Sequence, residues 1–508
     1  MKTWMAALAV AAALPAAAQD FPGYRAGNYT GVNGVFFNPA NIADSRYRFD
    51  VNLFSLNTYV GNDKASFKLK DVFKNSFEFD TLKNQMFGPN AGASSGMANF
   101  TVHGPSVMVS IGEKTGIAFT TRVRAVTNIR DMDGKLVDKL TSDFENDPSL
   151  PYTIQSQENM QLAVHGWTEF GVSFARTLLQ KEEHFLKGGF TAKYLAGAAN
   201  MYLNIGNFNG TLVENNIADD VELMNTTGRI GMGFGGVNIS DFDPEDLLEM
   251  KSTGFGGDIG FVYEWRPDAE KHTYGDKQLS RRDRNKYKLK VGVALLDIGK
   301  INYERDVQRS GDYDINITGP ERLSLSELGD QELDEFKQYF NSRPQFFTPA
   351  ATNNDAEYDV ALPTSLQLDV DYSLSDKFYV HGGAQLSLAK TNNKPYNTAY
   401  YSGFTLTPRY EGRAFGAYLP LNYNALTEFN AGLSLRFGPL FVGSGSVLSA
   451  LMGESKQADF HVGLRFGGLH KNKAKKYNKA KSKEEKKKEE KKSIEEKKEE
   501  GAASSIEG

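Results

Sequence analysis

Several short motifs contain the residue types of catalytic sites but not the spacing that catalysis needs. Residues 231–236, Gly-Met-Gly-Phe-Gly-Gly, fit the glycine pattern of a dinucleotide-binding loop, but no helix is predicted after them to hold the phosphates. Gly-Ser-Gly-Ser at 443–446 falls within a predicted strand, not on the strand-to-helix turn that presents a nucleophilic serine. The seven histidines include no His-Glu-x-x-His pair. The sequence therefore predicts no enzyme activity and no catalytic residue.

Metal and cofactor sites are not predicted either. The chain has no cysteine, which excludes thiol catalysis, disulfides and cysteine-ligated metals. Asp241, Asp243, Glu245 and Asp246 could bind calcium, but the glycine and the distal glutamate of a calcium-binding loop are absent. These acidic residues fit better as the first turn of a helix predicted over 240–248.

Charged residues recur at alternate positions of segments whose other positions are apolar. Residues 366–372, Leu-Gln-Leu-Asp-Val-Asp-Tyr, are one example. This period of two is typical of strands with one polar and one apolar face. If the apolar faces meet lipid, the charged side chains point into a barrel lumen. The candidates for lumen-facing charges are Arg122, Arg124, Asp369, Asp371, His381, Glu428, Arg436 and Arg465.

The elements that would position these side chains are about fourteen antiparallel strands between residues 48 and 467. Tight turns at 112–114, 180–183, 375–376, 412 and 439 alternate with long connections at 61–96, 128–164, 205–252 and 305–363. Short turns on one side and long loops on the other are typical of transmembrane β-barrels of the outer membrane. The fold class predicted is all-β, a fourteen-stranded transmembrane barrel, and a soluble sandwich is the alternative. A helix is also predicted at 329–340, within a long loop.

The N-terminus indicates export, and the C-terminus is a charged tail. Residues 1–18 combine a basic start, an apolar run too short to span a membrane and Ala-Ala-Ala before the predicted cleavage point, which is typical of a secretory signal peptide. Residues 468–508 form a charged tail, in which 471–500 contain 14 lysines and 8 glutamates and cannot bury a core. The tail is predicted to be periplasmic. It either reaches the cell wall or an envelope protein, or it only keeps the chain soluble.

The last strand alternates apolar residues and ends in an aromatic residue. Such a strand resembles the signal that the barrel-assembly machinery recognises, which makes this machinery and outer-membrane lipids the expected partners. No nucleic-acid partner is predicted. The residues of the predicted assembly signal are Phe460, Val462, Leu464 and Phe466.

The segment 19–47 contains turn-forming residues immediately before the first strand. With the predicted barrel, it resembles the FadL-type outer-membrane channels for hydrophobic molecules, in which a similar segment forms a plug inside fourteen strands. A periplasmic extension is the alternative. Glycine pairs such as Gly188-Gly189 and Gly382-Gly383 mark either strand kinks or close packing against a plug. The plug candidates are Gly31, Gly34, Phe36, Phe37, Asn38, Pro39 and Ala40.

A closer resemblance rests on three segments that occur in this order, GVNGVFFNPANIAD, LSLRFGPLFVGSG and SKQADFHVGLRFG. Together they look like an uncharacterised family of outer-membrane barrels common in Bacteroidota, over most of residues 21–467. The function implied is passive uptake of hydrophobic or amphipathic small molecules through a plugged channel. The alternative is a structural or assembly barrel that docks partners through its loops and tail. For the lumen-facing charges, three roles stay open: holding the plug, lining a substrate path or forming a specific site.

Overall fold

The computed structural model describes residues 20–74, 78–88, 92–156, 158–237, 251–267, 272–274, 279–350, 356–471 and 482–490. The predicted signal peptide and the helix predicted at 240–248 lie outside these residues. Most of the charged tail does as well, except for 468–471, which include the end of the last strand, and 482–490. Residues 482–490 form an exposed helix in which Glu484 and Lys488 lie 3.9 Å apart.

Fourteen antiparallel strands close into a barrel, as predicted. The first strand pairs with the last strand, where Val51 lies opposite Phe466. On its other side the first strand pairs with residues 106–109, where Val51 lies opposite Val107. Several barrel strands are broken into two elements. The wall consists of β1 (Tyr47–Asn62), β2 (Ala93–His103), β3 (Ser106–Ile111), β4 (Thr115–Asp133), β6 (Met160–Lys181), β7 (His184–Asn215), β9 (Ser252–Trp265), β12 (Leu289–Glu304), β17 (Ser365–Ser373), β18 (Phe378–Ser387), β19 (Gly403–Glu411), β20 (Phe415–Tyr418), β21 (Leu421–Asn424), β22 (Glu428–Ala431), β23 (Leu433–Phe437), β24 (Leu440–Ser444) and β25 (Gln457–Leu469).

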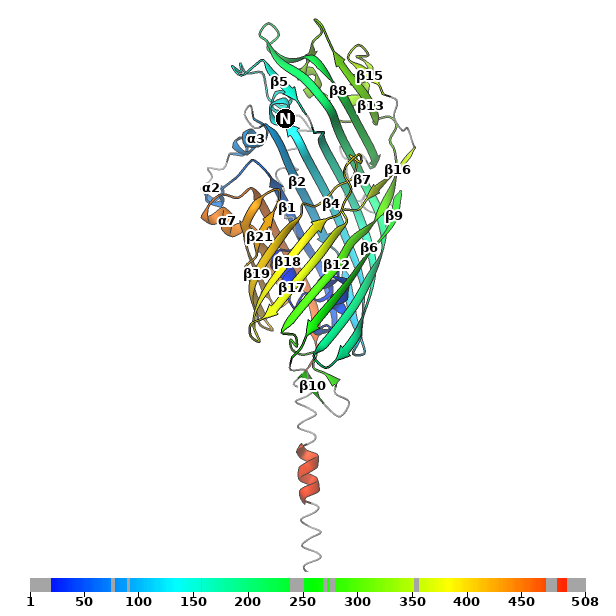
Figure 1. Ribbon diagram of the computed structural model, residues 1–508, viewed down its shortest axis with the longest axis vertical. Coiled ribbons are helices and arrows are strands. Elements are labelled where there is room, and N and C mark those ends of the chain that lie inside the picture. The colour runs from blue at the N-terminus through cyan, green and yellow to red at the C-terminus, as the bar shows by residue number, and fades with distance from the viewer. Residues whose placement is uncertain are drawn as a thin grey trace, which may run out of the picture.

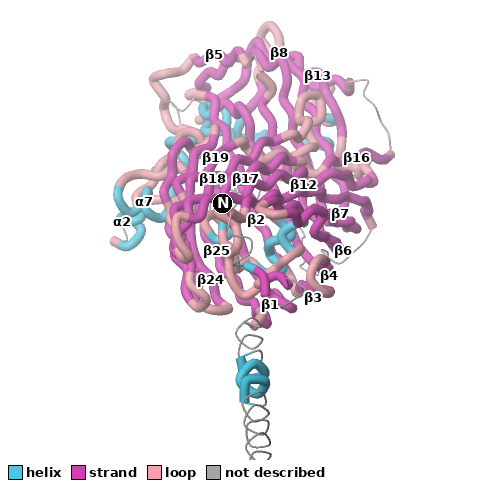
Figure 2. Tube along the Cα trace, turned by 60° about the horizontal axis from the view of Figure 1, so that its bottom comes forward, coloured by secondary structure: helices cyan, strands magenta, loops and turns pink. Residues whose placement is uncertain are grey.

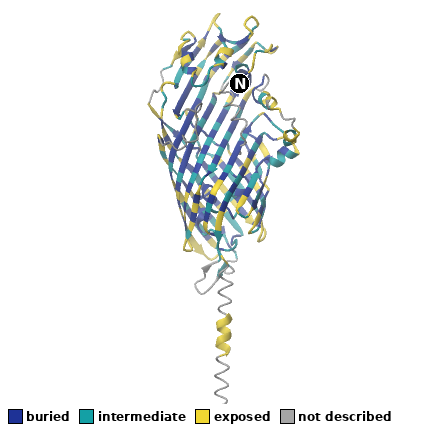
Figure 3. Cartoon of the chain, turned by 180° about the vertical axis from the view of Figure 1, so that it is seen from behind, coloured by how far each residue is buried: buried dark blue, intermediate teal, exposed yellow. Residues whose placement is uncertain are grey.

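The wall is apolar outside and polar inside. On β1, Phe49 and Leu53 are 44% and 46% exposed, whereas Asn52, Ser55 and Asn57 are fully buried. The same alternation gives the checkered surface of exposed and buried positions in the lower half of Figure 3. A soluble sandwich has the reverse arrangement, because it buries its apolar faces. An apolar belt around a polar interior is the pattern of a barrel that contacts lipid.

At the end opposite the tight turns, the sheet extends well beyond the barrel (Figure 1). β7 pairs with β9 over residues 184–197 and then with β8 over 199–215. The sequence prediction was wrong here, because 205–252 and 305–363 were expected to be loops. Glycine-rich and bulged stretches hide the alternation in these strands. The added strands are β5 (Tyr152–Gln155), β8 (Asp220–Gly236), β13 (Gly311–Ile317), β14 (Leu323–Ser324), β15 (Phe347–Pro349) and β16 (Glu357–Ala361); a separate ribbon joins β10 (Thr273–Tyr274) and β11 (Leu279–Ser280).

Short helices lie on the long connections. The prediction of a single helix at 329–340 was wrong, because the chain forms two short helices there. They are α5 (Leu325–Gly329) and, after a turn, α6 (Phe336–Asn341). α4 begins where the Asp133 carboxylate accepts a hydrogen bond from Leu136 N at 2.9 Å. α2 and α7 protrude together from one side (Figure 2). The remaining helices are α2 (Leu69–Phe73), α3 (Phe79–Phe87), α4 (Gly134–Thr141) and α7 (Val447–Met452).

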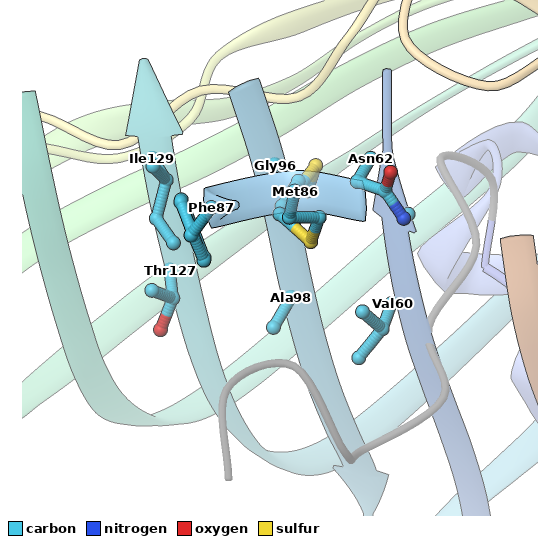
Figure 4. A pocket seen from close by; sticks show the side chains of 10 residues that line it. Val60, Asn62, Met86, Phe87, Gly96, Ala98, Thr127 and Ile129 are labelled. Atoms are coloured by element: carbon cyan, nitrogen blue, oxygen red, sulfur yellow. The ribbon is translucent and has the colours of Figure 1, made fainter. Parts of the chain in front are cut away.

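The helix α3 shows how these connections pack on the wall. Its Met86 and Phe87 lie across β1, β2 and β4 (Figure 4). The cavity left beneath them is about 20 Å³, which holds at most a water molecule. Among the described residues, no helix has the length and apolar character needed to cross a bilayer.

Candidate functional site

Residues 20–46, called the inner segment below, fill the tight-turn end of the barrel. They form three 3₁₀ turns, η1 (Tyr24–Ala26), η2 (Gly31–Phe36) and η3 (Pro39–Ile42), which Figure 2 shows enclosed by strands. Phe36, Phe37, Asn38 and Ala40 are all less than a tenth exposed. Pro39 and Gly34 are also buried, while Gly31 is partly buried and has a φ of +57°, which suits glycine.

Wall glycines make room for this segment. A Cβ on Gly189 would lie 2.7 Å from Ala40 N, and one on Gly116 would lie 2.3 Å from Ile42 O. On β9, a Cβ on Gly260 would meet the Asn38 side chain at 2.3 Å. Glycine is therefore required at these positions for the inner segment to contact the wall. Gly188, by contrast, faces Leu178 and Phe261, and a Cβ on Gly382 would have nothing within 4 Å.

The polar side chain of Asn38 also holds the inner segment against the wall. The Asn38 amide donates hydrogen bonds to Phe261 O and Val293 O, both at 3.2 Å. Its oxygen accepts from Ala40 N at 3.0 Å, so that one side chain both caps η3 and binds two strands.

Arg465 joins the inner segment to the seam between the first and last strands. Its guanidinium contacts Asp50 at 2.6 Å, the Tyr47 hydroxyl at 2.9 Å and the Tyr24 hydroxyl at 2.9 Å. It also donates to Tyr29 O. The second oxygen of Asp50 accepts from Val32 N at 2.8 Å. Arg465 was predicted to face the lumen, and it does so as a tie between wall and inner segment.

A second group of charges lies next to η1. Arg409 binds both oxygens of Asp371 at 2.7 Å, a bidentate pair, and contacts Glu411 at 3.2 Å. Glu411 in turn accepts from Asn28 N at 2.9 Å. Arg436 lies 4.5 Å over the ring of Tyr29. Predicted Asp371 and Arg436 thus face inward; Arg436 contacts the inner segment directly, and Asp371 is linked to it through Arg409 and Glu411.

A third group lies deeper in the lumen and balances three cations against three carboxylates. Arg122 and Arg124 both bind Glu169, at 2.7 and 3.0 Å. Lys193 lies 2.7 Å from both Asp258 and Asp297, and Arg124 also reaches Asp297 at 2.9 Å. All six side chains are nearly inaccessible to solvent. Buried charges need such complete pairing, and each of these six charges is compensated within the group.

Three predicted lumen residues remain, and only one of them, Glu428, does not face inward. His381 binds Asp369 at 3.1 Å on the inner face, as expected. The prediction for Glu428 was wrong, because its side chain is exposed and pairs with Lys456 at 2.8 Å. Its φ of +60° breaks the strand alternation at this position, which the sequence pattern could not reveal.

The residues that complete these groups were not predicted from the sequence. Arg409 and Glu411 lie at alternate positions of β19, so the alternation that predicted the other lumen-facing charges could also have predicted these two. Asp297 could not, because its φ of +58° places it at a bulge between Leu295 and Ile298. The other missed partners are Glu169, Lys193 and Asp258. Among the described residues, no three potential metal ligands come together.

A second segment, the inner loop of residues 388–402, folds into the lumen from the opposite end. Asn128 and Ala399 exchange two hydrogen bonds, at 3.1 and 2.8 Å. Tyr396 O accepts from Asn200 at 3.0 Å, and Arg124 donates to the Tyr400 hydroxyl. The expected strands at 377–391 and 400–411 are therefore shorter than predicted, and the chain between them spans the lumen.

An apolar cavity of about 100 Å³, called the outer cavity, lies on the extended sheet. Leu203 and Ile205 of β7 line it. They alternate with Tyr202, whose ring packs at 5.8 Å on Tyr396 of the inner loop, so the cavity lies on the opposite face of the wall. Leu333, Phe336 and Phe340, which the sequence placed on one helical face, cover it. All seventeen lining side chains are Leu, Ile, Val, Met or Phe.

Buried charges also tie the end of the inner segment to the connection before β12. Asp44 contacts Lys286 and, at 2.8 Å, Arg266. Burial alone would raise the pKa of Asp44, but Lys286 and Arg266 offset it and hold this pKa well below its usual range. Burial lowers the pKa of Lys286 to about 8, although Asp44 opposes the shift.

The last strand presents Phe460 and Phe466 on the outside, 41% and 50% exposed, with Val462 and Leu464 partly exposed on the same face. Their recognition by assembly machinery stays a prediction.

Three solved structures align with this chain at low sequence identity. A Pseudomonas aeruginosa FadL homologue aligns at 11% identity with a TM-score of 0.40, over 88% of this chain and 98% of that one. The Ralstonia pickettii toluene transporter TbuX aligns at 11% identity and 0.38, over 87% and 94%. The Pseudomonas putida toluene transporter TodX aligns at 9% identity and 0.31, over 87% and 95%. Among proteins with curated descriptions, none matches the chain.

The model of one protein family, described as a family of unknown function (DUF5723), matches residues 39–445. This range covers most of the barrel, from η3 to β24.

Proposed function

The chain belongs to this family of unknown function, DUF5723, and we propose from its own geometry that it is a plugged outer-membrane channel for passive uptake of small hydrophobic or amphipathic molecules. In this proposal the tight turns and the charged tail face the periplasm, the extended sheet faces the outside and the inner segment is the plug. The Bacteroidota origin implied by the resemblance stays a prediction. No catalysis is proposed.

The outer cavity is the observation that carries the proposal. An empty apolar space in a packed protein costs free energy, at roughly 24 cal/mol per Å³, and a barrel with only a structural role gains nothing from it. Apolar cavities of roughly 150 Å³ stay dry and bind benzene. A cavity of about 100 Å³ lined only by apolar side chains therefore suits the capture of a small hydrocarbon or an alkyl chain.

Passage beyond the cavity requires movement. The inner loop and the inner segment occupy the lumen from its two ends, and the group around Arg124 pairs its charges between them. A closed resting state is consistent with a channel that opens for its passenger and does not leak ions. It is equally the state expected of a structural barrel, so the two functions must be separated by experiment.

The test is uptake into proteoliposomes of octyl sulfate, an amphipathic molecule whose charge slows its passage through lipid, measured for the intact protein, Leu203→Trp and Phe190→Trp. Tryptophan at 203 fills the outer cavity. Phe190 lies on the same strand but in the lipid belt, 51% exposed, which makes it a matched control. We expect Leu203→Trp to lower uptake at least fivefold and Phe190→Trp to leave it unchanged. Equal uptake by both variants, or no uptake by the intact protein, would favour the structural barrel.

A further inference from the structure

A polar cavity of about 90 Å³, called the basic cavity, lies at the tight-turn end between the inner segment and the wall. Its lining comes from the inner segment, from the start of β7 and β12, and from the connection before β12. Six basic side chains line it, namely Arg25, Arg46, Lys187, Arg284, Lys286 and Lys290, together with the carboxylates of Asp44 and Glu264.

The two carboxylates are shared between lysines of the lining and Arg266, which lies outside it. Asp44 contacts Lys286 and Arg266. Glu264 lies 2.6 Å from Arg266 and 3.6 Å from Lys187. Arg266 does not line the cavity but pairs with both Asp44 and Glu264. These two carboxylates therefore compensate less of the positive charge of the basic side chains that line the cavity.

The two arginines of the inner segment make direct contacts with neutral groups, and the carboxylates that act on them, Asp369 on Arg25 and Glu411 on Arg46, do so from beyond ion-pair distance. Arg25 donates to the Gln367 oxygen at 3.0 Å and lies 5.1 Å over Phe37, and Arg46 lies 4.5 Å over Tyr29. Within the described part of the chain, neither has a carboxylate at ion-pair distance. Lys290 reaches Asp371 only at 3.5 Å, and Asp371 is already bound by Arg409 at 2.7 Å.

We propose that the basic cavity is an oxyanion site that binds a phosphate or carboxylate group. Partly buried positive charge in excess of its carboxylates attracts an anion strongly, because water screens it poorly there. Guanidinium groups match the geometry of phosphate and carboxylate oxygens. Arg25, Arg46, Arg284 and Lys290 are only partly buried, so that an anion can reach them from solvent, whereas Lys187 and Lys286 are buried behind them in the lining.

Binding at this place joins the inner segment to the wall. Arg25 and Arg46 belong to the inner segment, whereas Lys187 and Lys290 belong to β7 and β12. A bound anion therefore stabilises the docked state, by an amount that rises with the logarithm of its concentration relative to its dissociation constant. Anion binding at this site does not depend on what passes through the barrel.

Two kinds of ligand carry the phosphate or carboxylate group that this site would bind: a free oxyanion, or an amphipathic molecule with such a head group. The experiment titrates the full chain, purified in nonionic detergent, with inorganic phosphate or with hexyl phosphate by calorimetry, at constant ionic strength set with chloride. Arg25→Gln and Arg46→Gln remove lining charges. Lys300→Gln removes an exposed lysine at the far end of β12, 64% exposed and paired with Asp359, as the matched control.

We expect saturable phosphate binding to the intact protein and to Lys300→Gln, with affinity at least tenfold weaker in Arg25→Gln and Arg46→Gln. If either variant does not fold, Arg284→Gln, whose side chain is 39% exposed, takes its place. Tenfold tighter binding of hexyl phosphate assigns the site to a head group, and equal binding assigns it to a free oxyanion. No saturable binding of either probe, or equal affinity in all variants, overturns the proposal.

Discussion

At the scale of single residues, a few buried charges connect parts of the chain that are hundreds of residues apart. Arg465 links the last strand to Asp50 on the first strand and to Tyr24 of the inner segment. Removing one partner of a buried pair leaves an uncompensated charge, which costs more than the pair itself contributes.

We predict that Arg465→Met lowers the free energy of unfolding by roughly 3–5 kcal/mol, because it leaves Asp50 buried without its partner. The measurement is thermal or denaturant unfolding in detergent, followed by the shift in gel mobility between folded and unfolded barrel. Adding Asp50→Asn to Arg465→Met should recover part of the loss, since the pair is coupled. Strictly additive effects of the two changes would contradict this assignment.

The Asp44 carboxyl gives a prediction about pH. Its pKa in the folded protein lies below the unfolded value of about 3.9. It therefore contributes stability that is fully present above about pH 5 and is lost as the pH falls toward the folded pKa. We expect Asp44→Asn to be less stable at pH 7 and to lose less stability than the intact protein between about pH 5 and pH 3. Parallel pH profiles of unfolding temperature would contradict the ion pair with Lys286.

Strand alternation correctly predicted that seven of the eight charged candidates face inward, because a polar side chain opposite a lipid-facing one must point into the lumen. It failed at Glu428, where the backbone leaves the strand conformation. Strand alternation also could not predict which charged residues form ion pairs. Arg122 and Asp297, for example, are far apart in sequence and come together only in the closed barrel.

At the scale of elements, the inner segment fits the wall because the wall lacks side chains where they touch. Gly116, Gly189 and Gly260 lie on three strands and leave space for residues 38–42. Of the two roles considered for the pair Gly188-Gly189, the contacts of Gly189 with Pro39 and Ala40 agree with close packing against this segment.

We predict that Gly189→Ala displaces the inner segment, because the new Cβ would lie 2.7 Å from backbone atoms of Pro39 and Ala40. Trypsin should then cleave after Arg25 at least tenfold faster in the folded barrel. Gly382→Ala is the control, since nothing lies within 4 Å of its Cβ position. Equal cleavage rates in the two variants would show that the segment does not depend on this contact.

The sequence indicated the barrel strands well and the outer half poorly. A lipid-facing strand must alternate, so its pattern is visible. In the outer half both faces of the sheet are covered, for example by Phe336 and Phe340 on one face and by Tyr396 on the other. Alternation is then no longer required, and β8 and β13 could not be recognised.

At the scale of the whole molecule, the proposed channel combines three features: an outer cavity on the extended sheet that suits apolar molecules, an inner loop across the lumen and an inner segment at the tight-turn end. The basic cavity lies beside the last of these. If the protein is a channel, the inner segment is the barrier whose removal has the largest effect on ions, because it fills the tight-turn end.

The most direct measurement compares single-channel conductance in planar bilayers for the intact protein and for a variant lacking residues 21–44. We predict that the intact protein conducts little and that the deletion variant, folded by its gel mobility, shows discrete openings. If both proteins are folded and silent, the inner segment is not the plug of a channel, and a closed structural barrel is the better description.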